Sequence, residues 1–250
     1  MPRIIWMAFA TVAAFLAILL ARLPTAWALA FIPSSAEIQC VEPSGTLWAG
    51  RCGGVAIRGA SLGTLEWRLN ARSLLRGRLA GTASAHPAGG LLETRFEVPL
   101  FGGSVDVREL RMDLPLDPEL ASWLPPALRA RVSAQLRRLH FDGRRIDALA
   151  GRLVVQDLRE GDSPSQSLGS YELEFEQPAP VSGPLRGVLR DAGGPLAVQG
   201  TVTLTDGPGY LIEGRVAARP EASAELTRSV AILGSPDGAG GRPFSLSGTF

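Results

Sequence analysis

The segment LAVQGTVTLTDGPGYLIEGRV, residues 196–216, decides the fold class of this chain. Apolar and polar residues alternate along both halves of the segment, which predicts two β-strands, each with one apolar and one solvated face. Between the halves, Asp206–Gly209 has the composition of a tight turn. We therefore predict a β-hairpin whose apolar face carries Leu196, Val198, Val202, Leu204, Tyr210, Ile212 and Val216.

The same alternation recurs upstream, so most of the chain is predicted to form strands. It is found in the apolar sets Leu65, Trp67, Leu69; Phe96, Val98, Leu100; Leu149, Leu153, Val155; and Leu173, Phe175. Between Val105 and Leu114 the apolar positions change from odd to even numbers, which predicts a β-bulge near Arg108–Glu109. The 29 glycines and 19 prolines lie between these runs, as turn residues do.

Three segments have helical features. Glu221–Leu233 carries apolar residues at helical spacing between Pro220 and Gly234, which predicts a helix. We expect Pro118–Trp123 to form a short helical turn. Ala127–Phe141 fits a helix and a strand, because its apolar residues satisfy both periods, and both interpretations stay open.

These patterns predict a mainly β fold: a largely antiparallel sheet, curved or folded into a sandwich, with one or two short helices and a single transmembrane helix before it. The apolar face of such a sheet must be covered. A second sheet would cover it in a sandwich, whereas a curved sheet would leave a groove able to hold something apolar. The sequence does not decide between these two arrangements.

The N-terminal segment has the pattern of a membrane anchor. Residues 4–21 carry no charge and are bounded by Arg3 and Arg22. A helix of this length spans roughly 27 Å, close to the hydrocarbon thickness of a bilayer. Two alternatives are a secretory signal cleaved after the small residues of Ala26–Ala28 and a buried core helix.

An anchor at this position divides the chain into four parts. They are a cytoplasmic N-terminus (1–3), the transmembrane anchor (4–21), a membrane-proximal linker (22–36) and a periplasmic β-rich domain (37–250). The sequence has no second apolar stretch of spanning length, so the whole β-rich part is expected on one side of the membrane. All 25 basic residues are Arg, as in proteins from GC-rich bacterial genomes.

Cys40 and Cys52 are the two cysteines of the chain, and both follow the predicted anchor closely. If Glu37–Val41 and Gly54–Ile57 pair as neighbouring strands, the two thiols come within disulfide reach. In an oxidising periplasm we expect that bond to form. The alternative is two unrelated buried thiols.

The sequence has no pattern typical of an enzyme or a metal site. His86 and His140 have no further ligands at metal-binding spacing, and nucleotide-binding and nucleophile motifs are missing. The three glutamates of Glu172–Glu176 share one strand face, where solvated carboxylates are far commoner than a catalytic pair. A formal net charge of +1 argues against nucleic-acid binding. We expect no catalytic residue, no cofactor and no metal.

Four short segments resemble the type II secretion system protein N family. They are Ala21–Pro24 at the end of the predicted anchor; the turn Gly45-Thr46-Leu47-Trp48-Ala49-Gly50; the strand start Asp191-Ala192-Gly193-Gly194-Pro195-Leu196 with Gly200 following; and the closing segment Leu233–Gly248. The likeness covers most of the chain in order, although residues 91–168 match in hydrophobic rhythm alone. Within this family, Ala127–Phe141 is interpreted as a strand.

The resemblance implies a non-enzymatic accessory component of type II secretion, the general secretion pathway that exports folded proteins across the outer membrane. Such a protein is a single-pass protein of the bacterial inner membrane with its domain in the periplasm. Its implied partners are other secretion components, namely the inner-membrane platform or the secretin, and the membrane itself. The alternative is a periplasmic module that binds or shuttles lipid in a β-groove.

Overall fold

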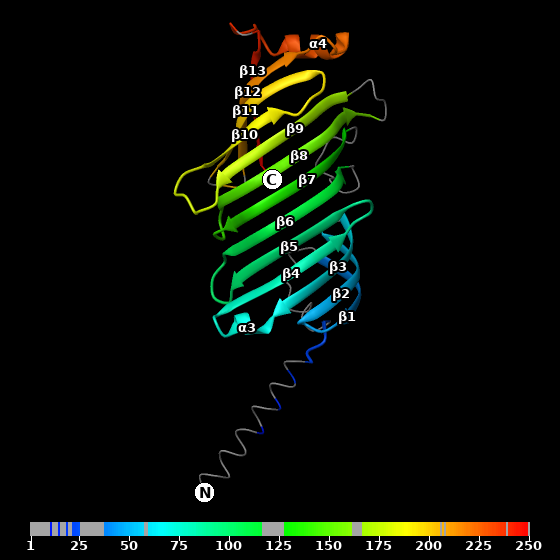
Figure 1. Ribbon diagram of the computed structural model, residues 1–250, viewed down its shortest axis with the longest axis vertical. Helices are drawn as coiled ribbons and strands as arrows, with labels where there is room; N and C mark the ends of the chain where they lie inside the picture. The colour runs from blue at the N-terminus through cyan, green and yellow to red at the C-terminus, as the bar shows by residue number, and fades with distance from the viewer. Residues whose placement is uncertain are drawn as a thin grey trace.

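One antiparallel sheet of thirteen strands makes up most of the protein (Figure 1). The computed structural model describes residues 11, 15, 19, 22–25, 38–57, 60–116, 128–161, 167–205, 207, 209–238 and 240–249. The strands are β1 Ile38–Gly45, β2 Ala49–Ile57, β3 Ala60–Asn70, β4 Arg78–His86, β5 Leu91–Pro99, β6 Val105–Leu116, β7 Leu128–Phe141, β8 Ile146–Glu160, β9 Ser167–Gln177, β10 Leu185–Asp191, β11 Leu196–Leu204, β12 Gly209–Ala218 and β13 Arg242–Thr249.

The strands follow one another in the sheet in the order of the sequence. Each strand between the edge strands β1 and β13 pairs with its predecessor and its successor, and the sheet twists along its length as neighbouring strands rotate (Figure 1). The described residues form this single open sheet and no second one. The predicted mainly β, antiparallel fold is thus confirmed, and the open sheet replaces the sandwich.

The hairpin predicted over residues 196–216 is formed by β11 and β12. Their register pairs Leu204 with Tyr210 next to the turn and Val198 with Val216 further along. The Thr205 amide donates a hydrogen bond to the carbonyl of Gly209 over 3.0 Å and closes the hairpin.

The predicted bulge near Arg108–Glu109 is also confirmed. The register between β5 and β6 shifts between Glu93 and Arg95, opposite the stretch that contains Glu109. Glu109 has a φ of 54°, which places it in the left-handed region. This extra residue explains the change of apolar parity, because it moves the following side chains to the other face of the sheet.

Two short helices accompany the described part of the sheet: α3 Ala71–Leu74 and α4 Ala224–Ile232. The prediction started α4 at Glu221, but the helix starts three residues later because the Ser223 hydroxyl caps it and accepts from the Leu226 amide. The ambiguous segment Ala127–Phe141 contains the long strand β7. The helical turn predicted at Pro118–Trp123 lies outside the described residues.

The core lies on one face of the C-terminal half of the sheet. Four buried side chains, Leu149, Phe175, Leu185 and Val202, form one cluster across β8–β11. A second cluster joins Val198 and Val216 of the sheet to Val230 of α4. The helix thus packs on the apolar face over β11 and β12. Figure 1 shows it at the top of the sheet.

The predicted anchor, residues 4–21, falls almost wholly outside the described residues. Among the described residues, no helix has the length and apolar character needed to cross a bilayer. The anchor and the division of the chain that follows from it therefore stay predictions.

Candidate functional site

The sheet has two faces of opposite chemistry. Residues directly opposite one another in register form rows across the strands, and the side chains of a row share a face. One row is apolar from β2 to β13: Cys52, Leu65, Ala85, Leu92, Met112, Ala134, Leu153, Leu173, Leu189, Gly200, Gly214 and Phe244. The next row, on the opposite face, is polar from β2 to β9: Arg51, Glu66, Ser84, Glu93, Arg111, Gln135, Arg152 and Glu174.

Glycines on the apolar face make room for aromatic rings. A Cβ atom on Gly214 would touch the backbone of Gly200 and the ring of Phe244. A Cβ atom on the family-like residue Gly200 would collide with the Glu213 carbonyl oxygen, so a glycine is needed there for the close approach of β11 to β12. The same face is half-buried over β3–β6, where Leu65, Leu92 and Met112 lie.

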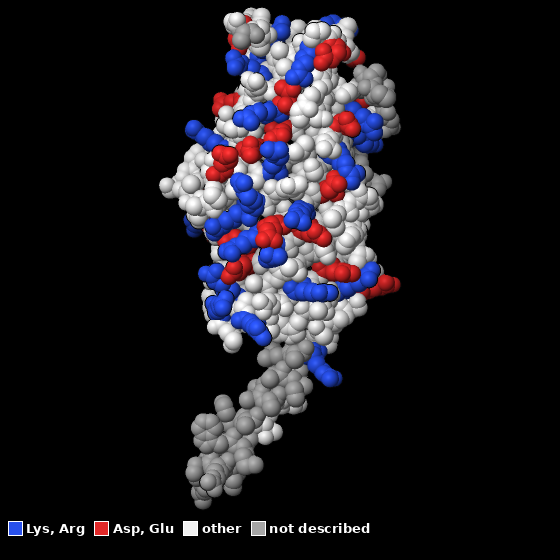
Figure 2. Space-filling view, in the orientation of Figure 1, with Lys and Arg blue, Asp and Glu red and all other residues white. Residues whose placement is uncertain are grey.

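The polar face carries Arg side chains alternating with carboxylates. Figure 2 shows basic and acidic groups interspersed over the sheet, with no large area of one sign. Arg131 binds both carboxylate oxygens of Asp113 at 2.7 and 2.9 Å, and Arg95 reaches Glu109 at 3.0 Å. Exposed pairs of this kind stabilise the fold little, typically by less than about 1 kcal/mol each. They do fix the pattern of charge that the face presents.

Two shallow hollows lie on this polar face. The larger, about 780 Å³, is lined by residues of β1–β6, among them Glu66, Glu93 and Arg95. The smaller, about 540 Å³, lies over β6–β9. Both are lined by Glu109 and Arg111 of β6, so the two hollows adjoin each other. We call the two adjoining hollows the polar trough; the charged side chains in their lining suit an ionic or hydrogen-bonding partner.

The family-like turn Gly45–Gly50 joins β1 to β2. Gly45 has a φ of 86°, and a Cβ there would collide with the Ala49 carbonyl. A Cβ on Gly50 would collide with the ring of Trp67. The Thr46 amide donates to the Ala49 carbonyl at 2.9 Å. Both glycines of the turn are therefore required by its geometry.

This turn holds the N-terminal segment against the sheet. The Leu47 amide donates to the Leu23 carbonyl at 2.9 Å, and the Trp67 indole donates to the Leu47 carbonyl at 3.0 Å. The Thr25 hydroxyl donates to the Ser44 carbonyl at 3.0 Å, and Thr25 is only 1% exposed. We call residues 22–25 with this turn the anchor junction.

Cys40 and Cys52 are joined by a disulfide in the structure, with their Cα atoms 5.6 Å apart. The register of β1 and β2 pairs Cys40 with Val55 and Cys52 with Pro43, so the disulfide joins two positions that are not directly opposite each other. Cys52 is fully buried. The bond ties edge strand β1 to β2 beside the anchor junction.

The second family-like segment forms the turn from β10 to β11. Gly193 and Gly194 both have positive φ, and a Cβ on Gly194 would collide with the Cα of Gly169. The Ser170 amide donates to the Gly193 carbonyl at 2.8 Å. Pro195 ends the turn, with its carbonyl bonded to the amide of Arg219. The hydrogen bond between Ser170 and Gly193 thus ties this turn to the start of β9.

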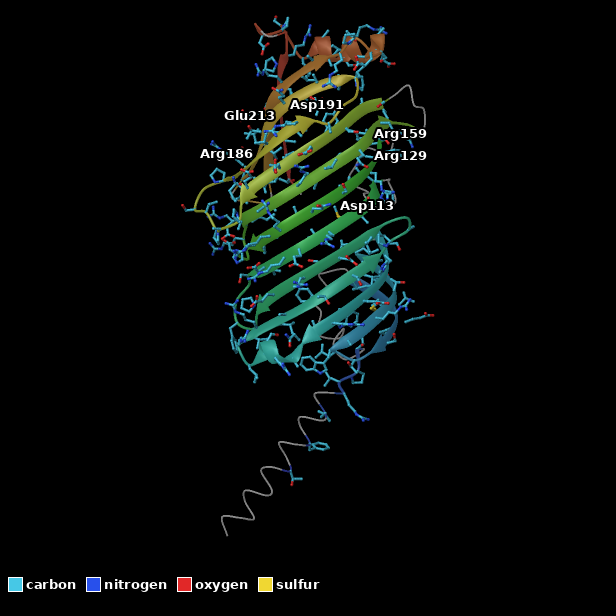
Figure 3. All side chains as sticks on the ribbon, in the orientation of Figure 1. Asp113, Arg129, Arg159, Arg186, Asp191 and Glu213 are labelled. Atoms are coloured by element: carbon cyan, nitrogen blue, oxygen red, sulfur yellow. A yellow bond between two sulfur atoms is a disulfide. The ribbon has the colours of Figure 1, made fainter. Side chains whose placement is uncertain are left out.

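Beside this turn lies an ion pair that the sequence patterns do not predict. Asp191, which is labelled in Figure 3, pairs with Arg219, and Arg219 also donates to the Gly194 carbonyl at 2.7 Å. Burial disfavours the charged form of Asp191, but hydrogen bonds from Arg219 and the Val198 amide outweigh it and lower the pKa of Asp191. Burial, followed by the charge of Asp191, raises the pKa of nearby Tyr171 to about 12. A separation of 28 residues hides such a pair from local sequence patterns.

The two family-like segments lie apart. The Gly45–Gly50 turn, with the half-buried Trp48 at its tip, follows β1, whereas Gly194, Pro195 and Leu196 precede β11. They do not meet in one site. Among the residues that the structure describes, no group of His, Cys, Asp and Glu is placed to hold a metal ion.

The remaining titratable residues singled out in the sequence belong to the sheet. Nδ1 of His140 lies 2.6 Å from Oδ1 of Asp147, at a register shift between β7 and β8. Glu172 pairs with Arg152 at 3.0 Å. These contacts join neighbouring strands, as structural pairs do.

The described residues thus define an open antiparallel β-sheet protein with one apolar face, one charged face and an N-terminal junction. A family model described as "Type II secretion system (T2SS), protein N" matches residues 36–245. The type II secretion system protein N of Aeromonas hydrophila is 25% identical over 260 residues, covering 94% of each chain. No solved structure matches. The chain belongs to the type II secretion system protein N family, and this membership supports an accessory role in protein secretion.

Proposed function

We propose that this protein is a non-enzymatic accessory component of type II secretion that acts by binding other secretion components through its polar trough. The proposed partners are the inner-membrane platform or the secretin. The observation that carries the proposal is the trough, where exposed Arg and Glu side chains alternate over β1–β9. Alternating charges of this kind select a partner and its orientation more than they add affinity.

We further propose that the chain is tethered in the inner membrane by residues 4–21, with the N-terminus in the cytoplasm and residues 37–250 in the periplasm. Tethering would raise the effective concentration of the sheet near membrane partners. A periplasmic location also agrees with the disulfide between Cys40 and Cys52. A reporter fused after Phe250 should be active in the periplasm; activity confined to the cytoplasm would contradict this topology.

A charge swap within the trough tests the contact. Glu93 and Arg111 lie opposite each other on β5 and β6. The double variant Glu93→Arg/Arg111→Glu keeps opposite charges facing one another and inverts the pattern shown to a partner. We expect export to fall several-fold in a complemented deletion strain, and co-purification of secretion components to fall with it. Arg228→Glu on the exposed surface of α4 is the matched control.

Two results would overturn the proposal. Normal export from the deletion strain would remove the role in secretion. Wild-type export and co-purification in the charge-swapped strain, at equal protein level, would remove the trough as the contact surface.

The second candidate function is lipid binding by the apolar face. The half-buried residues Leu65, Leu92 and Met112 on β3, β5 and β6 favour it. Native mass spectrometry of the purified full chain separates the two functions. Retained phospholipid that is lost when Met112 is changed to Asp would support lipid binding, whereas protein free of lipid would eliminate it.

A further inference from the structure

Three large apolar side chains are exposed in the loops on one side of the sheet, where strands end. Leu75 follows α3 and is 90% exposed; Phe101 lies between β5 and β6 and is also 90% exposed. Leu100, beside it, is 48% exposed. Apolar groups this exposed are normal singly, but a cluster of them marks a contact surface.

The two loops that carry these residues are neighbours. The Leu100 amide donates to the Gly77 carbonyl at 2.9 Å, and Arg78 pairs with Pro99 in the β4–β5 register. Leu75 therefore lies beside the Leu100–Phe101 loop. We call Leu75, Leu100 and Phe101 the apolar tip.

Basic residues surround the apolar tip. Arg72 and Arg76 are exposed, and neither has a carboxylate partner among the described residues. Arg78 pairs with Glu97 at 2.7 Å. Residues 70–78 and 99–105 contain no Asp or Glu. In the adjoining β7–β8 turn, exposed Asp142 is accompanied by Arg144 and Arg145, so the edge keeps a net positive charge.

The apolar tip lies at the same edge of the sheet as the anchor junction. Strand direction alternates, so the connections β1–β2, β3–β4 and β5–β6 all lie on the same side of the sheet, where these strands end. Pro24 bridges to Thr46 in the first of these connections, and the Leu69 amide, just before α3, donates to the Trp48 carbonyl at 2.7 Å. Figure 1 shows α3 at the lower end of the sheet, where β1 and β2 also lie.

We propose that the apolar tip inserts into the headgroup region of an anionic bilayer, with Arg72 and Arg76 bound to lipid phosphates. This inference rests on the proposed membrane tether, which brings this edge to the surface. Transfer of exposed Leu and Phe side chains from water into the bilayer is favourable, and Arg side chains are attracted by the negative surface potential of anionic lipids. The proposed anchor alone would attach the chain, and the tip would add a second contact with the bilayer that holds the sheet in a fixed orientation.

A fluorescent probe on Leu75→Cys tests the insertion. With Cys40 and Cys52 bonded, the new thiol is the one that reacts in the absence of reductant. The labelled full chain is reconstituted into vesicles of phosphatidylethanolamine and phosphatidylglycerol that carry a quencher at shallow depth. We expect a blue-shifted emission and several-fold more quenching than for the same probe on Ile232→Cys, which is 85% exposed on α4 at the far end.

Variants separate the two parts of the contact. Adding Phe101→Ser should reduce the quenching of the Leu75 probe in every vesicle. Adding Arg72→Gln and Arg76→Gln should remove the difference between anionic vesicles and vesicles of phosphatidylcholine. Equal quenching at Leu75 and Ile232 would overturn the proposal, as would quenching that appears only after a protein partner is added.

Insertion of the proposed anchor into the bilayer is measured independently of the apolar tip. A probe on Phe15→Cys reports whether residues 4–21 enter the bilayer. Quenching at Phe15 without quenching at Leu75 overturns the apolar tip and leaves the tether standing. Quenching at Leu75 without quenching at Phe15 supports the tip and overturns the tether, while the charge-swap assay on the trough is unaffected by either result.

Discussion

Leu185→Ala is expected to destabilise the protein strongly. Leu185 is 1% exposed and packs with Leu149, Phe175 and Val202. The change removes three buried carbon groups, worth about 0.8 kcal/mol each, and leaves a cavity that raises the cost to about 3–4 kcal/mol in total. For a chain of this size, 1 kcal/mol shifts the Tm by about 2–4 °C, so we expect a fall of about 6–16 °C.

Thermal unfolding of the purified full chain, followed by circular dichroism of the sheet, measures this shift. Leu75→Ala is the matched control, because the same atoms are removed from a side chain that is 90% exposed. Its free energy of unfolding should change by less than about 0.5 kcal/mol. Equal Tm values for the Leu185 and Leu75 variants would refute the assignment of the β8–β11 cluster as the core.

Three further predictions concern the polar contacts and the disulfide. The lowered pKa of Asp191 means that its pairing stabilises the fold above the unfolded-state pKa, near 4, and that this contribution is lost as the pH falls through the lower folded-state value. The Tm deficit of Asp191→Asn should therefore be constant from neutral pH to about 4 and shrink below it. Replacing Cys40 and Cys52 by Ser should lower the free energy of unfolding by about 3 kcal/mol, and the unreduced wild type should show no mass shift on alkylation. Thr25→Val should cost about 0.5–1.5 kcal/mol by removing the hydrogen bond from the buried Thr25 hydroxyl to the Ser44 carbonyl, and it should speed proteolysis at the anchor junction.

Local patterns predicted the strands because side chains in a strand alternate between two faces. The hairpin of residues 196–216 and the bulge at Glu109 follow from apolar parity alone, since one inserted residue moves all later side chains to the other face. The ambiguous segment Ala127–Phe141 shows the limit of this reasoning. Its apolar residues fit both periods, and pairing of β7 with β6 and β8 makes it a strand.

Long-range contacts decided what the pattern left open. The alternation of apolar residues shows that a strand has an apolar face. It does not show what covers this face, because the covering depends on sheet twist and on elements distant in sequence. The structure therefore supplied the single open sheet, the polar trough, the Asp191–Arg219 pair and the buried Thr25. Each of these features depends on residues that are distant in the sequence, so no local sequence pattern predicts it. Local alternation thus predicts which residues share a face, whereas pairing and packing between distant residues set the order of the strands and what covers each face.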